Sequence, residues 1–109
     1  MNTIERLQNW YISMCNGEWE HGNGVHVETL DNPGWHVKID LKDTDLEDRY
    51  FPVIEYGVGD DSDPDDNNWI ECKVENNVIH GHGGPEKLEE IFKHFLEWDE
   101  KFSEQRHSL

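Results

Sequence analysis

Two short runs of strand-forming residues, joined by four turn-forming residues, place the firmest constraint on the fold of this chain. The runs span residues 25–30 and 35–41, and the second alternates apolar and polar side chains with Trp35, Val37, Ile39 and Leu41 on one side. Such alternation is typical of a strand with one buried face. The linker is Asp31-Asn32-Pro33-Gly34, in which Pro and Gly suit the central positions of a type II turn. We therefore expect an antiparallel hairpin.

The first residues of the chain have the pattern of an amphipathic helix. Apolar residues recur at three- and four-residue spacing between residues 3 and 15, at Ile4, Leu7, Trp10, Tyr11 and Met14. Asn2 is placed to cap this helix, with Glu5 in the capping-box position. Asn16 and Gly17 follow, and a glycine here supplies the left-handed residue that commonly ends a helix.

A second helix is predicted near the end of the chain. The run Gly81-His82-Gly83-Gly84 indicates a loop, and Pro85 suits the first position of a helix that extends to about Gln105. Its apolar stripe consists of Leu88, Ile91, Phe92, Phe95, Trp98 and Phe102.

Further strands are predicted between these helices. Residues 50–58 form a third strand, where Pro52 favours a sheet edge or a strand start, and residues 69–74 and 78–80 form a second hairpin around residues 75–77. A chain of 109 residues has the usual size of one domain. We expect a single domain over residues 1–109 with an α+β fold, in which an antiparallel sheet of four or five strands is flanked by an N-terminal and a C-terminal helix.

The charge of the chain limits its partners. There are 25 Asp plus Glu against nine Lys plus Arg, for a formal net charge of -16. Phosphate backbones and anionic lipid surfaces are bound through clustered basic residues, so nucleic acid and membranes are excluded as expected partners. A protein with a basic surface fits well, because complementary potentials accelerate association.

The sequence also favours a cytoplasmic location. No segment approaches the roughly 20 apolar residues that span a bilayer, and the N-terminus lacks the basic and apolar pattern of a secretion signal. Cys15 and Cys72 are two cysteines far apart in sequence, unlike the disulfide framework of a small secreted domain.

Metal and cofactor motifs are weak. The acidic run Asp60-Asp61-Ser62-Asp63-Pro64-Asp65-Asp66 matches a calcium loop poorly, because Asp66 replaces the turn glycine when Asp61 is taken as the first ligand. We interpret it as an exposed acidic segment. His80 and His82 would share one face of a strand, but their spacing matches no zinc motif. We therefore expect no cofactor and no metal, while a metal-binding regulator remains an alternative.

Catalytic signals are weak as well. Cys15 lies at the predicted C-terminal end of a helix, where the helix dipole disfavours a thiolate, and Cys72 has the surroundings of a buried apolar residue. There is no nucleophile-elbow, phosphate-loop or dinucleotide motif. We expect a protein that is not an enzyme; the alternative is a small cysteine-dependent enzyme of the sulfurtransferase type that uses Cys15 or the Glu20-His21 pair.

Several of these motifs occur together in a known family. The chain resembles the immunity protein 53 family of bacterial polymorphic toxin systems. The resemblance is carried in order by Trp10-Tyr11, Cys15-Asn16-Gly17-Glu18-Trp19-Glu20-His21, Thr29-Leu30-Asp31-Asn32-Pro33-Gly34-Trp35, Trp69 with Cys72, and Gly83-Gly84-Pro85 followed by Leu88, Phe95 and Trp98. The segment from Asp60 to Asp66 is outside this pattern.

The resemblance implies a cytoplasmic antidote that binds a cognate toxin and blocks it, and toxins that attack nucleic acid present basic surfaces that suit an acidic inhibitor. The partner-binding residues follow from chemistry and not from the family. We predict that the aspartates between residues 60 and 66 steer the partner toward this protein, and that Glu18, Glu20, Asp31 and Asn32 contact it. Trp19 is either an anchor in that contact or a core residue. For Trp35 we favour the core. The aspartates are Asp60, Asp61, Asp63, Asp65 and Asp66.

Overall fold

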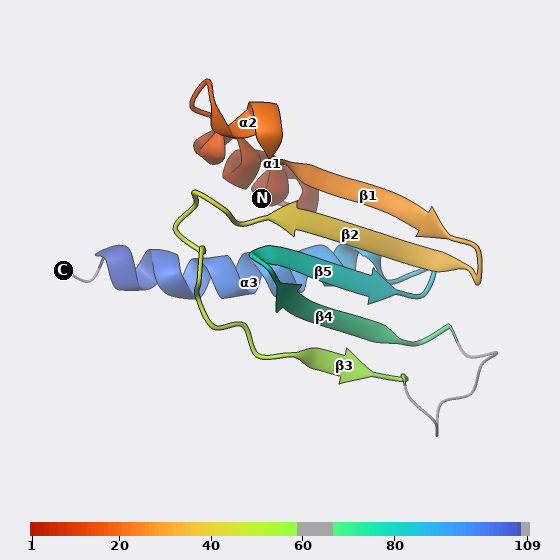
Figure 1. Ribbon diagram of the computed structural model, residues 1–109. Coiled ribbons are helices and arrows are strands. Elements are labelled where there is room, and N and C mark those ends of the chain that lie inside the picture. The colour runs from red at the N-terminus through yellow and green to blue at the C-terminus, as the bar shows by residue number, and fades with distance from the viewer. Residues whose placement is uncertain (59–66, 108–109) are drawn as a thin grey trace.

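The fold is seen in a computed structural model that describes residues 1–58 and 67–107 (Figure 1). The aspartates predicted to steer a partner, between residues 60 and 66, lie outside the described residues. The elements in chain order are α1 (Thr3–Met14), α2 (Trp19–Gly22), β1 (Val25–Leu30), β2 (Gly34–Asp40), β3 (Ile54–Tyr56), β4 (Ile70–Glu75), β5 (Val78–Gly83) and α3 (Leu88–His107). The predicted α+β class is confirmed. The short helix α2 was not predicted.

The five strands form one antiparallel sheet in the order β1-β2-β5-β4-β3. The edge strand β3 is much shorter than the predicted run of residues 50–58. The reason lies just before it, where Phe51 turns into the core at 7% exposure and the Trp98 indole donates a hydrogen bond of 2.9 Å to the Tyr50 carbonyl. That carbonyl is thereby engaged by a helix side chain and not by a neighbouring strand.

The first hairpin pairs as predicted, from Val25 opposite Ile39 to Leu30 opposite Gly34. Its turn differs from the prediction, because the Asn32–Pro33 peptide bond is cis and Gly34 already belongs to β2 without a positive φ. Gly34 is constrained instead by close approach, since a Cβ there would lie 2.4 Å from the Gly83 carbonyl oxygen on β5. The type II turn was therefore a wrong prediction.

The second hairpin joins β4 to β5 through two residues, Asn76 and Asn77, whose φ angles are 53° and 59°. Two central residues with positive φ match the right-handed twist of paired strands, and Asn tolerates this conformation better than other residues with a side chain.

Gly81 and Gly83 continue β5 and do not form the predicted loop, whereas Gly84 follows the strand. A Cβ on Gly81 would lie only 2.3 Å from Cγ2 of Ile91 in α3. The bare backbone therefore lets the helix pack directly on the strand, a common reason for glycine inside a strand. Helix α3 begins at Leu88, three residues after the predicted Pro85.

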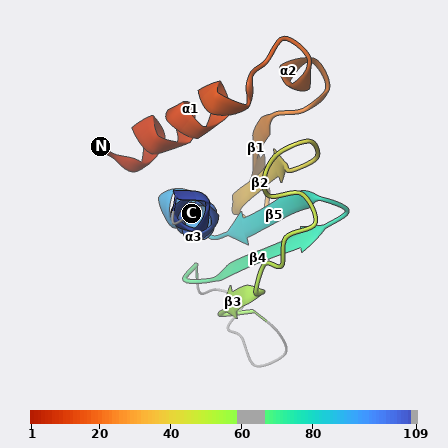
Figure 2. The ribbon, with the colours of Figure 1, turned by 90° about the vertical axis from the view of Figure 1, so that its left-hand side faces the viewer.

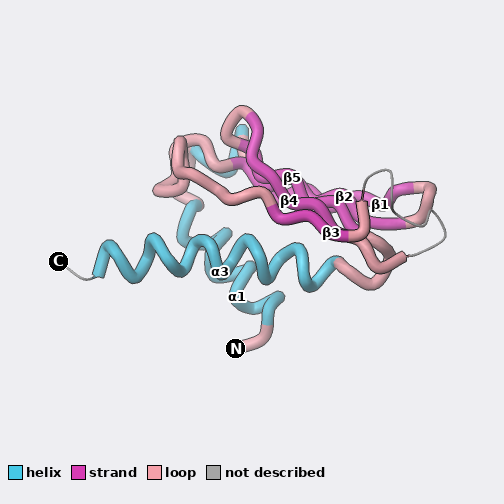
Figure 3. The backbone as a smooth tube through the Cα atoms, turned by 90° about the horizontal axis from the view of Figure 1, so that it is seen from below, coloured by secondary structure: helices cyan, strands magenta, loops and turns pink. Residues whose placement is uncertain are grey.

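The two long helices, α1 and α3, lie on one side of the sheet, and the short helix α2 lies beyond the β1 edge (Figures 2 and 3). Helix α3 runs along this face, and α1 packs against α3 (Figures 2 and 3). The opposite face of the sheet carries no helix in either view. This arrangement, with one packed face and one face open to solvent, is common for antiparallel sheets.

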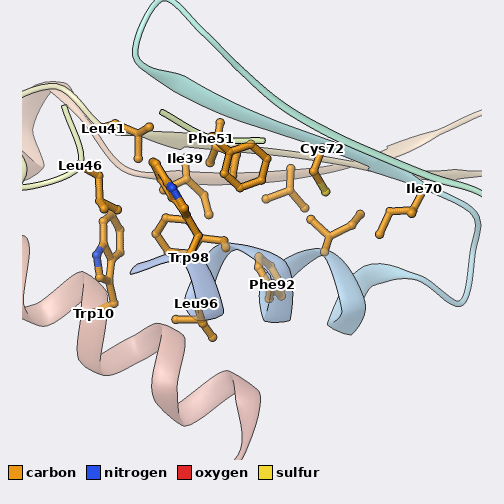
Figure 4. Close-up of a cluster of buried hydrophobic side chains, with 14 of the residues drawn as sticks. Trp10, Ile39, Leu41, Leu46, Phe51, Ile70, Cys72, Phe92, Leu96 and Trp98 are labelled. Atoms are coloured by element: carbon orange, nitrogen blue, oxygen red, sulfur yellow. The ribbon is translucent and has the colours of Figure 1, made fainter. Parts of the chain in front are cut away.

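The core lies between the sheet and α3 (Figure 4). Phe95 of α3 is fully buried and meets the Trp10 ring edge-to-face at 4.8 Å between centroids. The cap on α1 is confirmed, because Asn2 Oδ1 accepts a hydrogen bond of 2.9 Å from the Glu5 backbone N–H. The buried face of α1 is narrower than predicted: Ile4 is 52% exposed and Tyr11 38%, since α1 contacts mainly one helix and not the sheet.

Candidate functional site

The face of the sheet that no helix covers brings together polar side chains from all five strands. The register places Glu28, His36, His82, Glu71 and Glu55 opposite one another, in a row that crosses the sheet from β1 to β3. The neighbouring row consists of His26, Lys38, His80 and Lys73. This surface, which we call the open face, is the only broad side of the described sheet that no element packs against.

Three histidines gather at the centre of the open face. The His36 and His82 rings stack with their centroids 4.0 Å apart and an angle of 18° between planes. His36 Nε2 faces His80 Nδ1 at 3.2 Å. The sequence indicated that His80 and His82 share a face, and this is confirmed. The sequence could not place His36 beside these two histidines, because β2 and β5 are separated by two other strands along the chain.

The surroundings of two of these rings, His36 and His82, favour the neutral form. Burial lowers the pKa of His36 below its usual 6.5, with the charge of nearby His80 adding to the effect and the Glu28 carboxylate opposing it. Burial likewise lowers the pKa of His82, helped by His36. A neutral imidazole offers one donor and one lone pair, so the cluster can accept as well as donate hydrogen bonds.

Ion pairs lie on both sides of the three histidines. Glu28 Oε1 lies 3.4 Å from His36 Nδ1 and 3.7 Å from Lys38 Nζ. On the other side, Lys73 Nζ lies 3.6 Å from Glu71 and 3.3 Å from Glu75. Such exposed pairs stabilise the fold by at most about 1 kcal/mol each. Both lysines thus have carboxylate partners on their own surface.

The predicted contact residues Glu18 and Glu20 lie just before α2 and in its first turn, where they have different roles. Glu20 accepts backbone N–H bonds from Asn16 at 3.0 Å and from Gly17 at 2.9 Å. Hydrogen bonding by its own backbone N–H and by that of Asn16 lowers the pKa of its carboxyl. The Glu20 carboxylate therefore stabilises the turn between α1 and α2, whereas Glu18 is exposed.

Trp19, left open between anchor and core, is a core residue in this structure. It is 4% exposed, meets Trp10 edge-to-face at 6.0 Å, and donates a hydrogen bond of 2.9 Å from Nε1 to the Lys42 carbonyl. Trp35 is half-buried, and its Nε1 donates to the Pro85 carbonyl at 2.8 Å. Both indoles therefore fix connecting segments to the body of the domain.

Asp31 and Asn32 are exposed in the turn between β1 and β2, at the end of β1 remote from Glu18 and Glu20. The length of β1, about 20 Å, separates the two groups along the sheet. Trp69, which follows the acidic segment, lies near this turn, because a Cβ on Gly34 would lie 3.3 Å from its Cζ2 atom. The structure therefore does not bring all the predicted contact residues together.

The helices α1 and α3 and the segment around Asp45 border an open recess of about 500 Å³. Its charged lining consists of Arg6, which pairs with Glu100, and of the carboxylates Asp45 and Asp99. Trp10 also lines it, and within the described part of the chain the Trp10 Nε1 is a buried donor with no hydrogen-bond partner. Carboxylates on its wall favour a cationic group over an anionic one.

Cys72 is unsuited to nucleophilic chemistry, because burial first, and the Glu90 and Glu71 charges next, raise the pKa of its thiol to about 12. At pH 8 only about one thiol in ten thousand is then ionised in the folded protein. In a Cys15→Ser variant we expect alkylation of Cys72 by iodoacetamide to be at least about a thousandfold slower than in denaturant. Rapid native alkylation, followed by mass spectrometry, would contradict the buried position.

The chain is thus an acidic α+β protein with an open polar sheet face and exposed carboxylates at its loops. The family model for immunity protein 53 matches residues 4–100, so the chain belongs to the immunity protein 53 family. No curated protein and no solved structure matches the chain. Among the described residues, no helix is both long and apolar enough to cross a membrane.

Proposed function

We propose that this immunity protein acts in the cytoplasm by binding a cognate toxin domain through a basic surface of the toxin, and that it performs no catalysis. The match over residues 4–100 supports an immunity function, and the net charge of -16 supports a basic partner. A nuclease is the toxin class that fits best, because a surface that binds phosphates also attracts carboxylates.

The proposed contact surface lies at the end of the sheet that carries the β1–β2 turn. Asp31 and Asn32 are exposed there, and the chain re-enters the described fold at Asn67 near the same end. In the proposal, the aspartates between residues 60 and 66 steer the toxin toward these contacts. Glu18, on the remote side, is a secondary contact, while Trp19 and Glu20 support the fold around it.

The function is tested by expressing the toxin domain encoded by the adjacent gene, alone and together with this protein, in a bacterial host. We expect the toxin alone to stop growth, co-expression to restore it, and the two purified proteins to form a stoichiometric complex. A control co-expression uses an unrelated acidic protein of similar size and charge. Toxin activity that persists in a molar excess of this protein would contradict the proposal.

The enzymatic alternative makes a different prediction at Cys15. Its thiol is partly exposed and donates a hydrogen bond of 3.3 Å to the Tyr11 carbonyl at the C-terminal end of α1. We expect a Cys15→Ser variant to protect cells from the toxin as well as the unchanged protein does. Loss of protection, or rapid alkylation of Cys15 at pH 6, would support the cysteine-dependent enzyme.

A further inference from the structure

We propose that His36 and His80 on the open face form a binding site for a divalent transition-metal ion of the zinc type, with His36 Nε2 and His80 Nδ1 as the two protein ligands. The proposal is independent of toxin binding. It rests on the arrangement of the two strands, which brings these nitrogen atoms together from residues 44 positions apart in sequence.

The spacing of the two nitrogens suits such an ion. They are 3.2 Å apart. Two ligands at the usual zinc–nitrogen distance of about 2.05 Å and this separation subtend roughly 100° at the metal, close to the tetrahedral angle. Imidazole nitrogen is also a preferred ligand for zinc, nickel and copper.

The Glu28 carboxylate fixes the tautomer that the site needs. Its Oε1 lies 3.4 Å from His36 Nδ1, which favours a proton on Nδ1 and leaves the Nε2 lone pair toward His80. A carboxylate that orients a ligating histidine in this way is the common second partner in metal sites. His80 then binds through Nδ1 and retains its proton on Nε2.

The neighbouring groups hold the ligands and limit the site. His82 stacks on His36 at 4.0 Å and so restrains the rotation of that ring. Lys38 and Lys73 lie opposite His80 and oppose a cation, although each is paired with a carboxylate. Among the described residues no three His, Cys, Asp or Glu side chains could together hold a metal ion, so water completes the coordination at an open, two-histidine site.

The test is a calorimetric titration of the whole protein with ZnCl₂ in a buffer that contains excess MgCl₂, so that carboxylates are already occupied. We expect one zinc ion per chain in the wild type and no saturable binding up to about 1 mM in a His36→Gln/His80→Gln variant. Glu28→Gln should weaken binding about tenfold or more. His94→Gln on α3 is the matched control and should bind zinc unchanged.

A second measurement uses the unchanged protein. Long-range ¹H–¹⁵N spectra of the histidine rings should report a proton on His36 Nδ1, and zinc should shift the signals of His36 Nε2 and His80 Nδ1 before those of other histidines. Zinc binding that survives in the double variant would overturn the proposal. So would an absence of saturable binding in the wild type, or zinc-induced shifts confined to other histidines.

Discussion

Replacing Phe95 by alanine is expected to lower the free energy of unfolding by about 3–5 kcal/mol, a large share of the about 5–15 kcal/mol available to a domain. Phe95 is fully buried between the sheet and α1, and it holds the Trp10 ring edge-to-face. Its removal leaves a cavity at the point where α1, α3 and the sheet meet, and the large rings around it cannot readily collapse into the space.

Urea unfolding followed by tryptophan fluorescence measures this effect. The midpoint should fall while the slope against urea stays the same, because the surface exposed on unfolding is nearly unchanged. The control is Ile12→Ala, which removes an apolar side chain from the same helix pair at a position 65% exposed, and it should change stability by no more than about 0.5 kcal/mol. A loss below about 1 kcal/mol for Phe95→Ala would contradict the packing of α1 on α3.

The local elements of this fold could be predicted from the sequence because their signals are local. Alternation in residues 35–41 and the paired asparagines at residues 76 and 77 each specify a hairpin within about a dozen residues. The pairing of β2 with β5 is different in kind. It joins strands separated by β3 and β4 in the chain, and no short pattern encodes such a pairing.

The features that sequence reasoning missed all depend on contacts between segments far apart in the chain. His36 meets His80 and His82 only because β2 lies beside β5. Gly81 suggested a loop, because a glycine that permits a turn cannot be told in sequence from one that makes room for a neighbouring side chain. In the structure Gly81 makes room for Ile91 of α3. Trp19 stood between polar residues without periodicity, and only the position of Trp10 and the Lys42 carbonyl places it in the core.

Changing the five aspartates between residues 60 and 66 to asparagine is expected to slow association with the toxin domain by about tenfold or more at low ionic strength, with little change in the dissociation rate. These carboxylates are concentrated within seven residues of an already acidic chain. Charges so close together attract a basic partner before contact is made, which raises the rate of encounter more than the lifetime of the complex.

Stopped-flow fluorescence with the toxin domain identified by co-expression tests this prediction at two ionic strengths. The difference between variant and wild type should shrink at 0.15 M salt, where the Debye length is about 8 Å. A matched control removes the same number of negative charges elsewhere and should retain most of the wild-type association rate, through Glu5→Gln, Asp43→Asn, Glu47→Gln, Glu75→Gln and Glu97→Gln. An equal slowing in the control would assign the effect to net charge. An unchanged association rate with much faster dissociation would make the aspartates direct contacts, and no change in either rate would exclude them from recognition.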